Sequence, residues 1–542
     1  MSDDEEDLLD EDESLRDLSV LRSRDTARRK RCLDSLAKLI DVWITPDEEN
    51  VDQDGKKALT EILPSILMLS LRCPFPDVRE KCSEIIDNVK KKGFRTPRPL
   101  FKGPSSFIPS KEIPPIDTDD EQTHTLLVES FLSAGRVSSV TAVMSIHPQY
   151  LEWFSRTEFY IMQGEGPLPF DWRHYIAIMA ASRHQCCYLV NIYEIEFLRF
   201  NGNKQWLKGI QHVPRKLQLL SDINKYLAHQ PWLIEPRHIE TLLKGEDNWS
   251  LSELVQAIVI LAHFHSLASF VFGCGVVAEI DQESGHTFRP PSMTDSTQSS
   301  FDNSAVNSNI VDNNEFMTGD ELVARMEEAL AYQEKIMEAS QEELFHYFEK
   351  LESGELAQSS SETAKTQECL VSDVAHYIQD AKFRYKDFAS REHTEISTYR
   401  IGDCSWEEHG YSLVNRLYPD IGTILDEKFS SSMSLTYLTL GDKTNVDTTL
   451  FRRATWNYIH LIFGIYHDDY LYTEVNKLME RSYKRYIKTV ATCPEKTTQE
   501  DYMEFMPQLT HSERVHINLL LLEARQQAEL LYAVRAILKY MK

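Results

Sequence analysis

Residues 445–470, NVDTTLFRRATWNYIHLIFGIYHDDY, carry the clearest pattern of hydrophobic and polar positions in the chain. Spacing of about 100° per residue predicts one helix here, with Asp447 as N-cap and Gly464 as the stop. Its two apolar stripes are formed by Leu450, Ala454, Tyr458 and Leu461, and by Trp456, Ile459 and Phe463. Arg452 falls on the second stripe, so we expect a buried guanidinium that requires an anionic partner.

Helical periodicity recurs along most of the chain, whereas the alternation typical of strands is scarce, so we predict an all-α fold. Changes in composition divide the chain into four parts. These are an acidic tail and helical extension ending in a proline-rich connection (1–123), a first helical domain (124–277), a partly disordered linker with one charged helix at 318–351 (278–370) and a second helical domain (371–542).

A long apolar run, residues 254–277, raises the question of a membrane span. It contains the polar residues Gln256 and His263, and Ser250 with Glu253 predicts a capping box at its start. We therefore predict a buried core helix and no membrane insertion.

Composition narrows the function further. The formal net charge of −27 argues against general binding to nucleic acid or to anionic membranes. The nine cysteines are scattered without CxxC pairs, and the acidic start SDDEEDLLDEDE is unlike a signal peptide, so we expect reduced thiols in a cytoplasmic protein.

The cluster Arg28–Arg31 is either a solvated basic helix face or a nuclear-import signal. No closed ligand set is evident, so we expect no metal and no other cofactor.

Cys186, in the segment SRHQCCYLV, is the candidate for thiol chemistry. If a helix begins near it, the helix dipole and the preceding Arg183 and His184 favour the reactive thiolate. The alternative is that Cys186 and Cys187 are small apolar residues of a helical core.

Several further segments have a distinctive sequence. Within 124–277 they are DWRHYIAIMA, RHQCCYLV and LAHFHSLASFVFGCG, and within 402–542 they are SWEEHGYSLVNRLYP, DEKFSSSMSLTYLT, VDTTLFRRATWNYIH, YHDDY, YIKTVATCPEKTT and VHINLLLLEARQQAELLYAVRAI. Together they resemble the sestrin family. The resemblance implies two all-helical domains similar to alkyl hydroperoxidase D, joined by a helical linker, in a stress-induced cytosolic protein that restrains the TOR growth pathway.

For some sestrins the resemblance also implies reduction of hydroperoxides in the first domain. The cysteine and tyrosine of that site fall on Cys186 and Tyr188, but Tyr193 stands where the family has a relay histidine. A tyrosine with a pKa of about 10 is a poor proton relay at neutral pH. A thiol-dependent alkyl hydroperoxide reductase is therefore our alternative function.

The same resemblance implies a site for a free amino acid, such as leucine, in the second domain. The ligand carboxylate would pair with Arg452 and the ligand ammonium with Glu513. The other ligand-binding positions fall on Thr436, Tyr437, Thr439, Thr448 and His516. The alternatives are an internal acidic partner for Arg452 and a capping box formed by Thr510 and Glu513.

Two positions of that site depart from the leucine-binding pattern of the family. Met506 stands where close relatives have tryptophan, and Phe451 replaces a leucine. A flexible methionine makes the pocket looser or shapes it for another apolar side chain. We therefore expect amino-acid binding with a weaker affinity for leucine than in a tryptophan-bearing relative.

Two surfaces are candidates for partner proteins. Asp468 and Asp469 follow a predicted helix C-terminus, where acids oppose the helix dipole; they form either a solvated loop or, as the resemblance implies, a contact for the GATOR subcomplex. Arg481, Lys484, Arg485 and Lys488 recur on one helix face, which is either solvated or, as the resemblance implies for Arg481, Lys484 and Lys488, a contact for Rag GTPases. Our leading hypothesis is a non-enzymatic, amino-acid-responsive inhibitor of TOR complex 1 signalling, and a scaffold without a ligand is a third interpretation.

Overall fold

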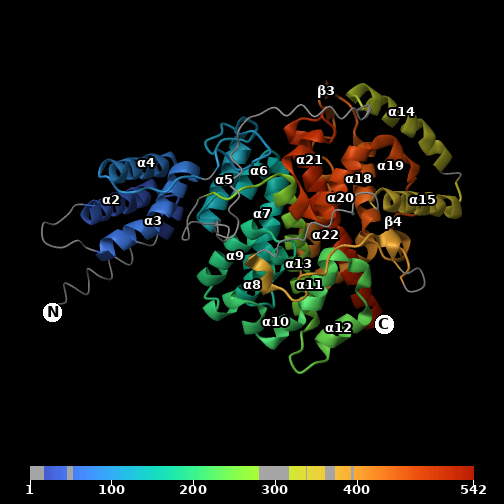
Figure 1. Cartoon of the computed structure of the whole chain (residues 1–542), viewed down its shortest axis with the longest axis horizontal. Helices are drawn as coiled ribbons and strands as arrows, with labels where there is room; N and C mark the ends of the chain where they lie inside the picture. The colour runs from blue at the N-terminus through green and yellow to red at the C-terminus, as the bar shows by residue number, and fades with distance from the viewer. Residues whose placement is uncertain are drawn as a thin grey trace. The chain divides into compact units, whose positions relative to one another are not determined.

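The regular secondary structure of the computed structural model is almost all helix, with only very short strands, which confirms the predicted all-α class (Figure 1). It describes residues 18–44, 53–99, 101–279, 317–336, 339–359, 373–391 and 396–542. Contacts divide the chain into two compact units, one of Met1–Arg156 with Cys274–Arg289 and one of Thr157–Gly273 with Pro290–Lys542. The second unit therefore draws on both of the helical domains that the sequence predicts.

The first unit is built from amphipathic helices that bury one face each. They are α2 (Thr26–Ile44), α3 (Gln53–Arg72), α4 (Pro76–Lys91), α5 (Glu121–Ala134) and α6 (Ser139–Met144), followed by the start of α7 (Pro148–Gln163). Leu36, Ile66 and Val78 of α2, α3 and α4 are fully buried in one hydrophobic cluster, which also takes in Phe131 of α5. Burial of this apolar surface, rather than helix propensity, holds the helices together.

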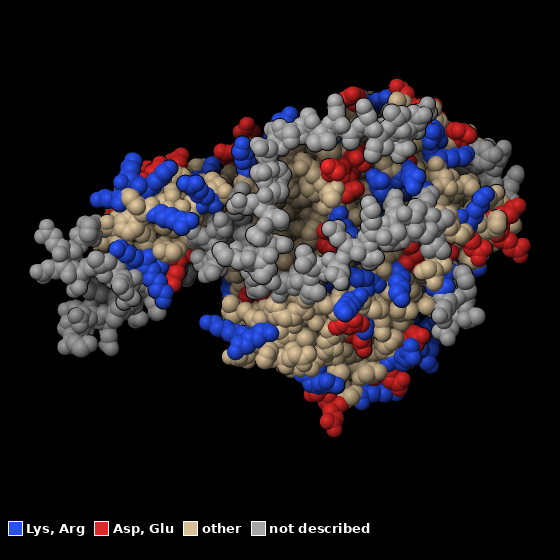
Figure 2. All heavy atoms as spheres, in the orientation of Figure 1, with Lys and Arg blue, Asp and Glu red and all other residues tan. Residues whose placement is uncertain are grey.

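The basic cluster Arg28–Arg31 lies in the first turns of α2 and is only partly solvated. Arg29 is buried and forms a bidentate ion pair with Asp77, with both N–O distances 3.0 Å. Its guanidinium also stacks on Phe75, 3.9 Å from the ring centre. The other three members are exposed, and basic side chains gather over α2–α4 on the face seen in Figure 2.

The second unit contains the remaining helices and two very short strand pairs. The helices are α8 (Phe170–Arg183), α9 (Cys187–Arg199), α10 (Arg215–Leu219), α11 (Ser221–His229), α12 (Pro236–Leu243), α13 (Leu251–Gly273), α14 (Gly319–Ile336), α15 (Gln341–Ser359), α16 (Tyr411–Leu417), α17 (Ile421–Ser432), α18 (Thr449–Ile462), α19 (Thr473–Leu478), α20 (Arg481–Thr492), α21 (Gln499–Glu504) and α22 (His511–Met541). Parallel β1 (Tyr399–Arg400) and β4 (Ile465–Tyr466) pair Tyr399 with Ile465, and antiparallel β2 (Thr439–Leu440) and β3 (Lys443–Thr444) pair Thr439 with Thr444.

Helices α13 and α22 pack along each other at the centre of this unit (Figure 1). Among the described residues, α13 is the one helix long and apolar enough to cross a membrane, but its apolar stretch is entirely buried inside the protein. The Ser250–Glu253 capping box predicted at its start is present. The prediction of a core helix is therefore confirmed for α13.

A buried polar network crosses the α13–α22 contact. Arg525 donates to Glu529 at 3.1 Å and to Ser269 at 2.6 Å, and the other Glu529 oxygen lies 2.8 Å from Nδ1 of His265. Nε2 of His265 donates its proton to the side-chain oxygen of Asn224. The short contact between Nδ1 and the Glu529 carboxylate therefore needs one more proton, which is carried either by His265 or by Glu529. Burial raises the pKa of Glu529 to about 8 and lowers that of His265 well below its usual range, which places this proton on Glu529 at neutral pH.

The linker differs from the single charged helix predicted at 318–351. The structure has two helices there, α14 and α15. Ser340 and Glu343 form reciprocal hydrogen bonds at the start of α15, with the Ser340 N–H donating to the Glu343 carboxylate at 3.0 Å. This capping box starts a new helix within a stretch whose charge pattern appeared continuous.

Candidate functional site

Helix α18 carries the buried arginine that the sequence predicts. Arg452 is 5% exposed and donates from Nη1 to Thr448 Oγ1 at 2.5 Å and from Nη2 to Thr449 Oγ1 at 3.0 Å. Its Nε has no hydrogen-bond partner, and no residue in the described part of the chain forms an ion pair with it. Burial lowers its pKa, while the more distant Asp447 opposes that shift. The predicted burial is confirmed, and the internal acidic partner that was the alternative to a ligand carboxylate is absent among the described residues.

The start of α18 differs slightly from the prediction. Thr448 occupies the N-cap position, and the carboxylate of Asp447 accepts the backbone N–H of Thr449 at 2.9 Å. Gly464 follows the helix end with a φ of 74°, as expected for a stop. The first turn therefore holds Thr448 and Thr449 against the Arg452 guanidinium.

A loop containing the β2–β3 hairpin, here called the hairpin loop (436–448), lies over this first turn. The backbone N–H and the hydroxyl of Thr448 both donate to the carbonyl of Tyr437, at 3.0 and 3.1 Å. The Tyr437 side chain is largely exposed, with its ring centre 5.9 Å from the Arg452 guanidinium carbon. Thr439 is exposed, and its hydroxyl donates to the carbonyl of Thr436 at 3.4 Å. The four predicted hydroxyl residues therefore belong to one loop that reaches Arg452.

The first turns of α22 contact the other side of the hairpin loop. The Glu513 carboxylate accepts the backbone N–H of Gly441 at 2.9 and 3.0 Å and also caps α22 through Thr510. His516 donates from Nε2 to the carbonyl of Ser432 at 2.6 Å, so its Nδ1 accepts from the hydroxyl of Thr436 at 2.6 Å. Hydrogen bonds therefore connect every predicted ligand-binding residue through one loop.

Gly441 is a residue of this site that the sequence analysis missed. Its φ is 61°, and a Cβ there would lie 2.3 Å from the carbonyl oxygen of Gln508. Only glycine fits this close approach, which brings its N–H to Glu513. The Gly-Asp pair between alternating residues in LTLGDKT was the available signal for a hairpin.

The two departures from the family pattern are both buried. Met506 has no exposed surface and a φ of 44°, and its carbonyl accepts from Arg514 at 3.3 Å. Phe451 is buried beside Arg452 on α18 and stacks on Tyr483, with 5.5 Å between ring centres. Both side chains are therefore fixed by packing.

Cys186 lies at the N-cap of α9 but is almost completely buried. Burial raises the pKa of its thiol, and the first N–H groups of α9 oppose this rise only in part. The preceding residues do not favour the thiolate as expected, since Arg183 donates to the carbonyl of Asp380 at 3.0 Å and His184, whose pKa is lowered by burial, is a neutral ring that accepts from Arg525 at 2.6 Å. The thiol is therefore protonated at neutral pH, whereas Cys187 is exposed.

Tyr188 and Tyr193, which fall on the tyrosine and relay positions of the family's cysteine site, are both buried. Tyr193 donates its hydroxyl to the carboxylate of Glu158, and its ring packs on Phe264 with 4.5 Å between centres. Tyr188 is 8% exposed. This environment is that of a packed helical core.

Asp468 and Asp469 lie just beyond β4. Asp468 is half-buried and accepts the backbone N–H of Gly402 at 2.7 Å. Asp469 is exposed and pairs with Arg453 of α18 at 2.9 Å. Both acids are therefore held in place, and Asp469 remains accessible to solvent.

The four cations predicted on one face of α20 have different environments, and Arg485 is exposed and pairs with Glu504 at 3.1 Å. Arg481 is exposed, whereas Lys484 is buried and donates to Asn476 at 3.0 Å. Lys488 forms an ion pair with Asp387 at 2.7 Å. They therefore do not form one uniformly solvated surface. Among the described residues, no group of three or more His, Cys, Asp or Glu side chains is placed to hold a metal ion.

The fold and the hairpin loop define an all-α protein with a buried arginine at a helix start that forms no ion pair with any described residue. A family model described as PA26 p53-induced protein (sestrin) matches residues 103–541. The chain is 48% identical to Sestrin-1 of Macaca fascicularis over 473 residues, which covers 85% of this chain and 95% of that relative. It is 46% identical to Sestrin-2 of Homo sapiens over 444 residues, covering 81% of this chain and 91% of that relative. The chain therefore belongs to the sestrin family.

Proposed function

We propose that the chain binds a free α-amino acid of the leucine type at Arg452 and acts as a cytoplasmic regulator of TOR complex 1 signalling. The observation that carries this proposal is the buried guanidinium of Arg452, which has an unpartnered Nε and no carboxylate partner among the described residues. An unpaired buried cation is costly, and a ligand carboxylate would offset that cost.

The polar groups around Arg452 are suited to the rest of an amino acid. Among the described residues, Gly441 is the one donor to Glu513 Oε1, so this oxygen retains capacity for a ligand ammonium. The hydroxyls of Thr436 and Thr448 can hydrogen-bond the ligand without adding charge. We propose that Phe451, the neighbour of Arg452 on α18, and Met506, which follows α21, provide the apolar contacts for the ligand side chain. Capping of α22 and ligand binding are therefore compatible roles for Glu513.

Ligand binding at the Arg452 site would affect the binding of partner proteins through α18. The helix presents Arg452 to the hairpin loop and Arg453 to Asp469. A ligand that repositions the first turn of α18 would therefore alter the surface around Asp468 and Asp469, where we propose that the GATOR subcomplex docks. Arg481, with Lys484 and Lys488 behind it on α20, is the proposed contact for Rag GTPases.

Titration calorimetry with leucine tests the ligand proposal. We expect Arg452→Ala to weaken binding about 100-fold, since charge-assisted hydrogen bonds to a carboxylate contribute roughly 1.5–3 kcal/mol each. The matched control is Arg485→Ala, which removes an exposed arginine of α20 that pairs with Glu504. This variant should bind leucine normally. Unchanged leucine binding in Arg452→Ala would overturn the proposal.

The regulatory step needs its own measurement. We expect leucine to change capture of the purified GATOR subcomplex by the wild-type protein but not by Arg452→Ala. If leucine binds normally but no amino acid changes capture of the GATOR subcomplex, the ligand proposal stands and the coupling between the ligand site and the partner surface is refuted.

A further inference from the structure

Arg183 is a second buried arginine that forms no ion pair with any described residue. It is the last residue of α8, is 1% exposed and donates from Nη1 to the carbonyl of Asp380 at 3.0 Å. Its Nε and Nη2 have no hydrogen-bond partner among the described residues. The carboxylates of Asp380 and Asp222 pair instead with Lys225, at 3.7 and 2.9 Å. The guanidinium of Arg183 is therefore buried with most of its donors unused.

Two histidine rings beside Arg183 also have unpartnered nitrogens. Nε2 of His184 accepts from Nη2 of Arg525 at 2.6 Å, so Nδ1 carries the proton of this neutral ring. The same Arg525 nitrogen donates to the carbonyl of Ala228 at 3.0 Å, which holds His184 at the end of α11. The ring centre of His229, the last residue of α11, lies 5.1 Å from that of His184. Nδ1 of His184 and both nitrogens of His229 have no hydrogen-bond partner in the described part of the chain.

The carbonyl of Asp380 brings Arg183 to the same place. It accepts from Arg183 at 3.0 Å and from the backbone N–H of Phe383 at 3.1 Å. The Phe383 ring in turn lies 6.2 Å from the His229 ring, centre to centre. Burial and, next to it, the charge of Arg183 lower the pKa of His229 well below its usual range, so that ring is neutral. Arg183, His184 and His229, here called the α8–α11 cluster, therefore lie together where α8 and α11 end.

The unpartnered atoms of the α8–α11 cluster are mostly donors. Arg183 offers the N–H groups of Nε and Nη2, His184 offers that of Nδ1, and the neutral ring of His229 offers one donor and one acceptor. The charge has the same sign, because Arg525 is also buried and its carboxyl partner Glu529 is protonated at neutral pH. Neither guanidinium is hydrogen-bonded to an ionised carboxylate of the described chain. An acceptor with negative charge therefore fits the cluster better than a water molecule, which both donates and accepts.

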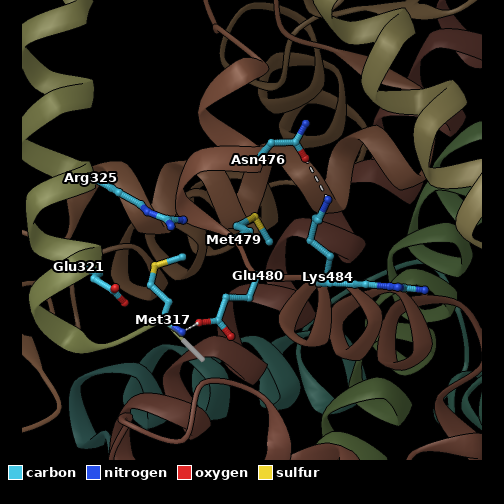
Figure 3. A pocket seen from close by; sticks show the side chains of 8 residues that line it. Met317, Glu321, Arg325, Asn476, Met479, Glu480 and Lys484 are labelled. Carbon is cyan, nitrogen blue, oxygen red and sulfur yellow. Dashed lines mark hydrogen bonds between the residues drawn. The ribbon is translucent and has the colours of Figure 1, made fainter. Parts of the chain in front are cut away.

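The pocket between the starts of α14 and α20 differs in this respect (Figure 3). It is lined by Glu321 and Glu480 as well as by Arg325 and Lys484, and Lys484 donates to Asn476 at 3.0 Å. Acids and bases offset one another there, so the charge of that pocket does not favour an anion.

We propose that the α8–α11 cluster binds a small inorganic anion of the size of chloride. A buried guanidinium and buried N–H groups without acceptors are both costly, and an anion bound to Arg183, His184 and His229 would offset both costs. The anion must be small because all three side chains are almost completely buried, which closes the cluster to an extended organic ligand. None of the three residues belongs to the amino-acid site at Arg452, so the proposal does not depend on leucine binding.

Thermal unfolding tests the proposal when potassium chloride replaces potassium gluconate at constant ionic strength, since gluconate is too large for the cluster. We expect the Tm of the wild-type protein to rise by roughly 2–4 °C between about 10 and about 300 mM chloride, because an anion bound to the folded state stabilises it. Arg183→Gln should lose this rise. The matched control is Arg173→Gln, which removes another buried arginine of α8, one that donates to the carbonyls of Leu168 and Gly164. This control should keep the rise.

Wild-type crystals grown in bromide give a second readout that needs no variant to fold. We expect an anomalous-scattering peak within hydrogen-bond distance of Arg183 and His229. Water molecules alone at this position would overturn the proposal, as would an equal response to chloride in wild type and Arg183→Gln. Leucine binding by Arg183→Gln, expected to match wild type, keeps this result separate from the amino-acid site.

Discussion

Arg453 donates from Nη2 to both the carboxylate and the backbone carbonyl of Asp469, at 2.9 and 3.0 Å. The preceding residue, Arg452, is turned into the protein against Thr448 and Thr449. Consecutive arginines on α18 therefore point in directions about 100° apart around the helix axis and have different partners. The ligand site proposed at one and the partner surface proposed at the other are separated by a single peptide bond.

We predict that Arg453→Gln separates ligand binding from its readout. Because the pair with Asp469 is exposed, its loss should change the free energy of unfolding by less than about 1 kcal/mol. Leucine affinity should stay within about twofold of wild type, because charge-assisted contacts to Arg452 are untouched. Capture of the GATOR subcomplex, measured with and without leucine, should lose its dependence on leucine. Asp469→Asn should behave in the same way, and a normal response in both variants would contradict the role given to α18.

Alkylation distinguishes the adjacent cysteines. Burial raises the thiol pKa of Cys186, and each unit of increase lowers the thiolate fraction at neutral pH about tenfold. We expect iodoacetamide at pH 7.5 to modify Cys187 at least tenfold faster, measured by mass spectrometry on Cys186→Ser and Cys187→Ser proteins. In denaturant the two rates should converge. Fast modification of Cys186 in the folded protein, together with hydroperoxide turnover that Cys186→Ser abolishes, would support the alternative enzymatic function instead.

Met506→Trp should tighten leucine binding at a cost in stability. Met506 is fully buried, and a larger ring in a packed site typically costs about 1–3 kcal/mol. If a tryptophan at this position provides leucine selectivity, calorimetry should show a lower Kd while thermal unfolding shows a lower Tm. Met506→Leu keeps the volume nearly constant and should leave both values close to wild type. An unchanged or higher Kd in Met506→Trp would remove Met506 from the selectivity argument.

The raised pKa of Glu529 should make the free energy of unfolding depend on pH. Its pKa is raised by burial to about 8 in the folded protein, so the folded state holds a proton that the unfolded carboxyl releases near pH 4.5. Below about pH 6.5, His265 is protonated in the unfolded state but not in the folded state. This extra proton of the unfolded state balances the proton that Glu529 holds in the folded state, so the pair causes no net pH dependence there. The free energy of unfolding should therefore fall as pH rises from about 6.5 to 8, by up to about 1.4 kcal/mol per pH unit.

Glu529→Gln tests this because an amide can donate to His265 and accept from Arg525 as the protonated acid does. Urea unfolding at several pH values should show that the variant loses the slope between about pH 6.5 and 8. Glu504→Gln, at an exposed carboxylate, is the control and should retain the wild-type slope. Parallel curves for wild type and Glu529→Gln would disprove the assignment.

Periodicity predicted the all-α class, the burial of Arg452 and the capping box at Thr510 and Glu513, because each depends on residues close in sequence. It missed the hairpin at Gly441, since strands of two residues are too short to show alternation. Periodicity also predicted a single helix where α14 and α15 are separate, because charged residues continue through the capping box that begins at Ser340. The contact between His265 and Glu529 could not be predicted, as their pairing depends on how α13 and α22 pack.

The packing of α13 against α22 also determines how the protein can be divided. A fragment that begins after α13 would expose the apolar side of α22 to water and would leave Arg525 and Glu529 without Ser269 and His265. Conversely, cleavage of the chain between α13 and α14 would leave two pieces that remain associated through this buried contact. Fragments of the second unit are therefore expected to function when they are produced together, and to aggregate when either is produced alone.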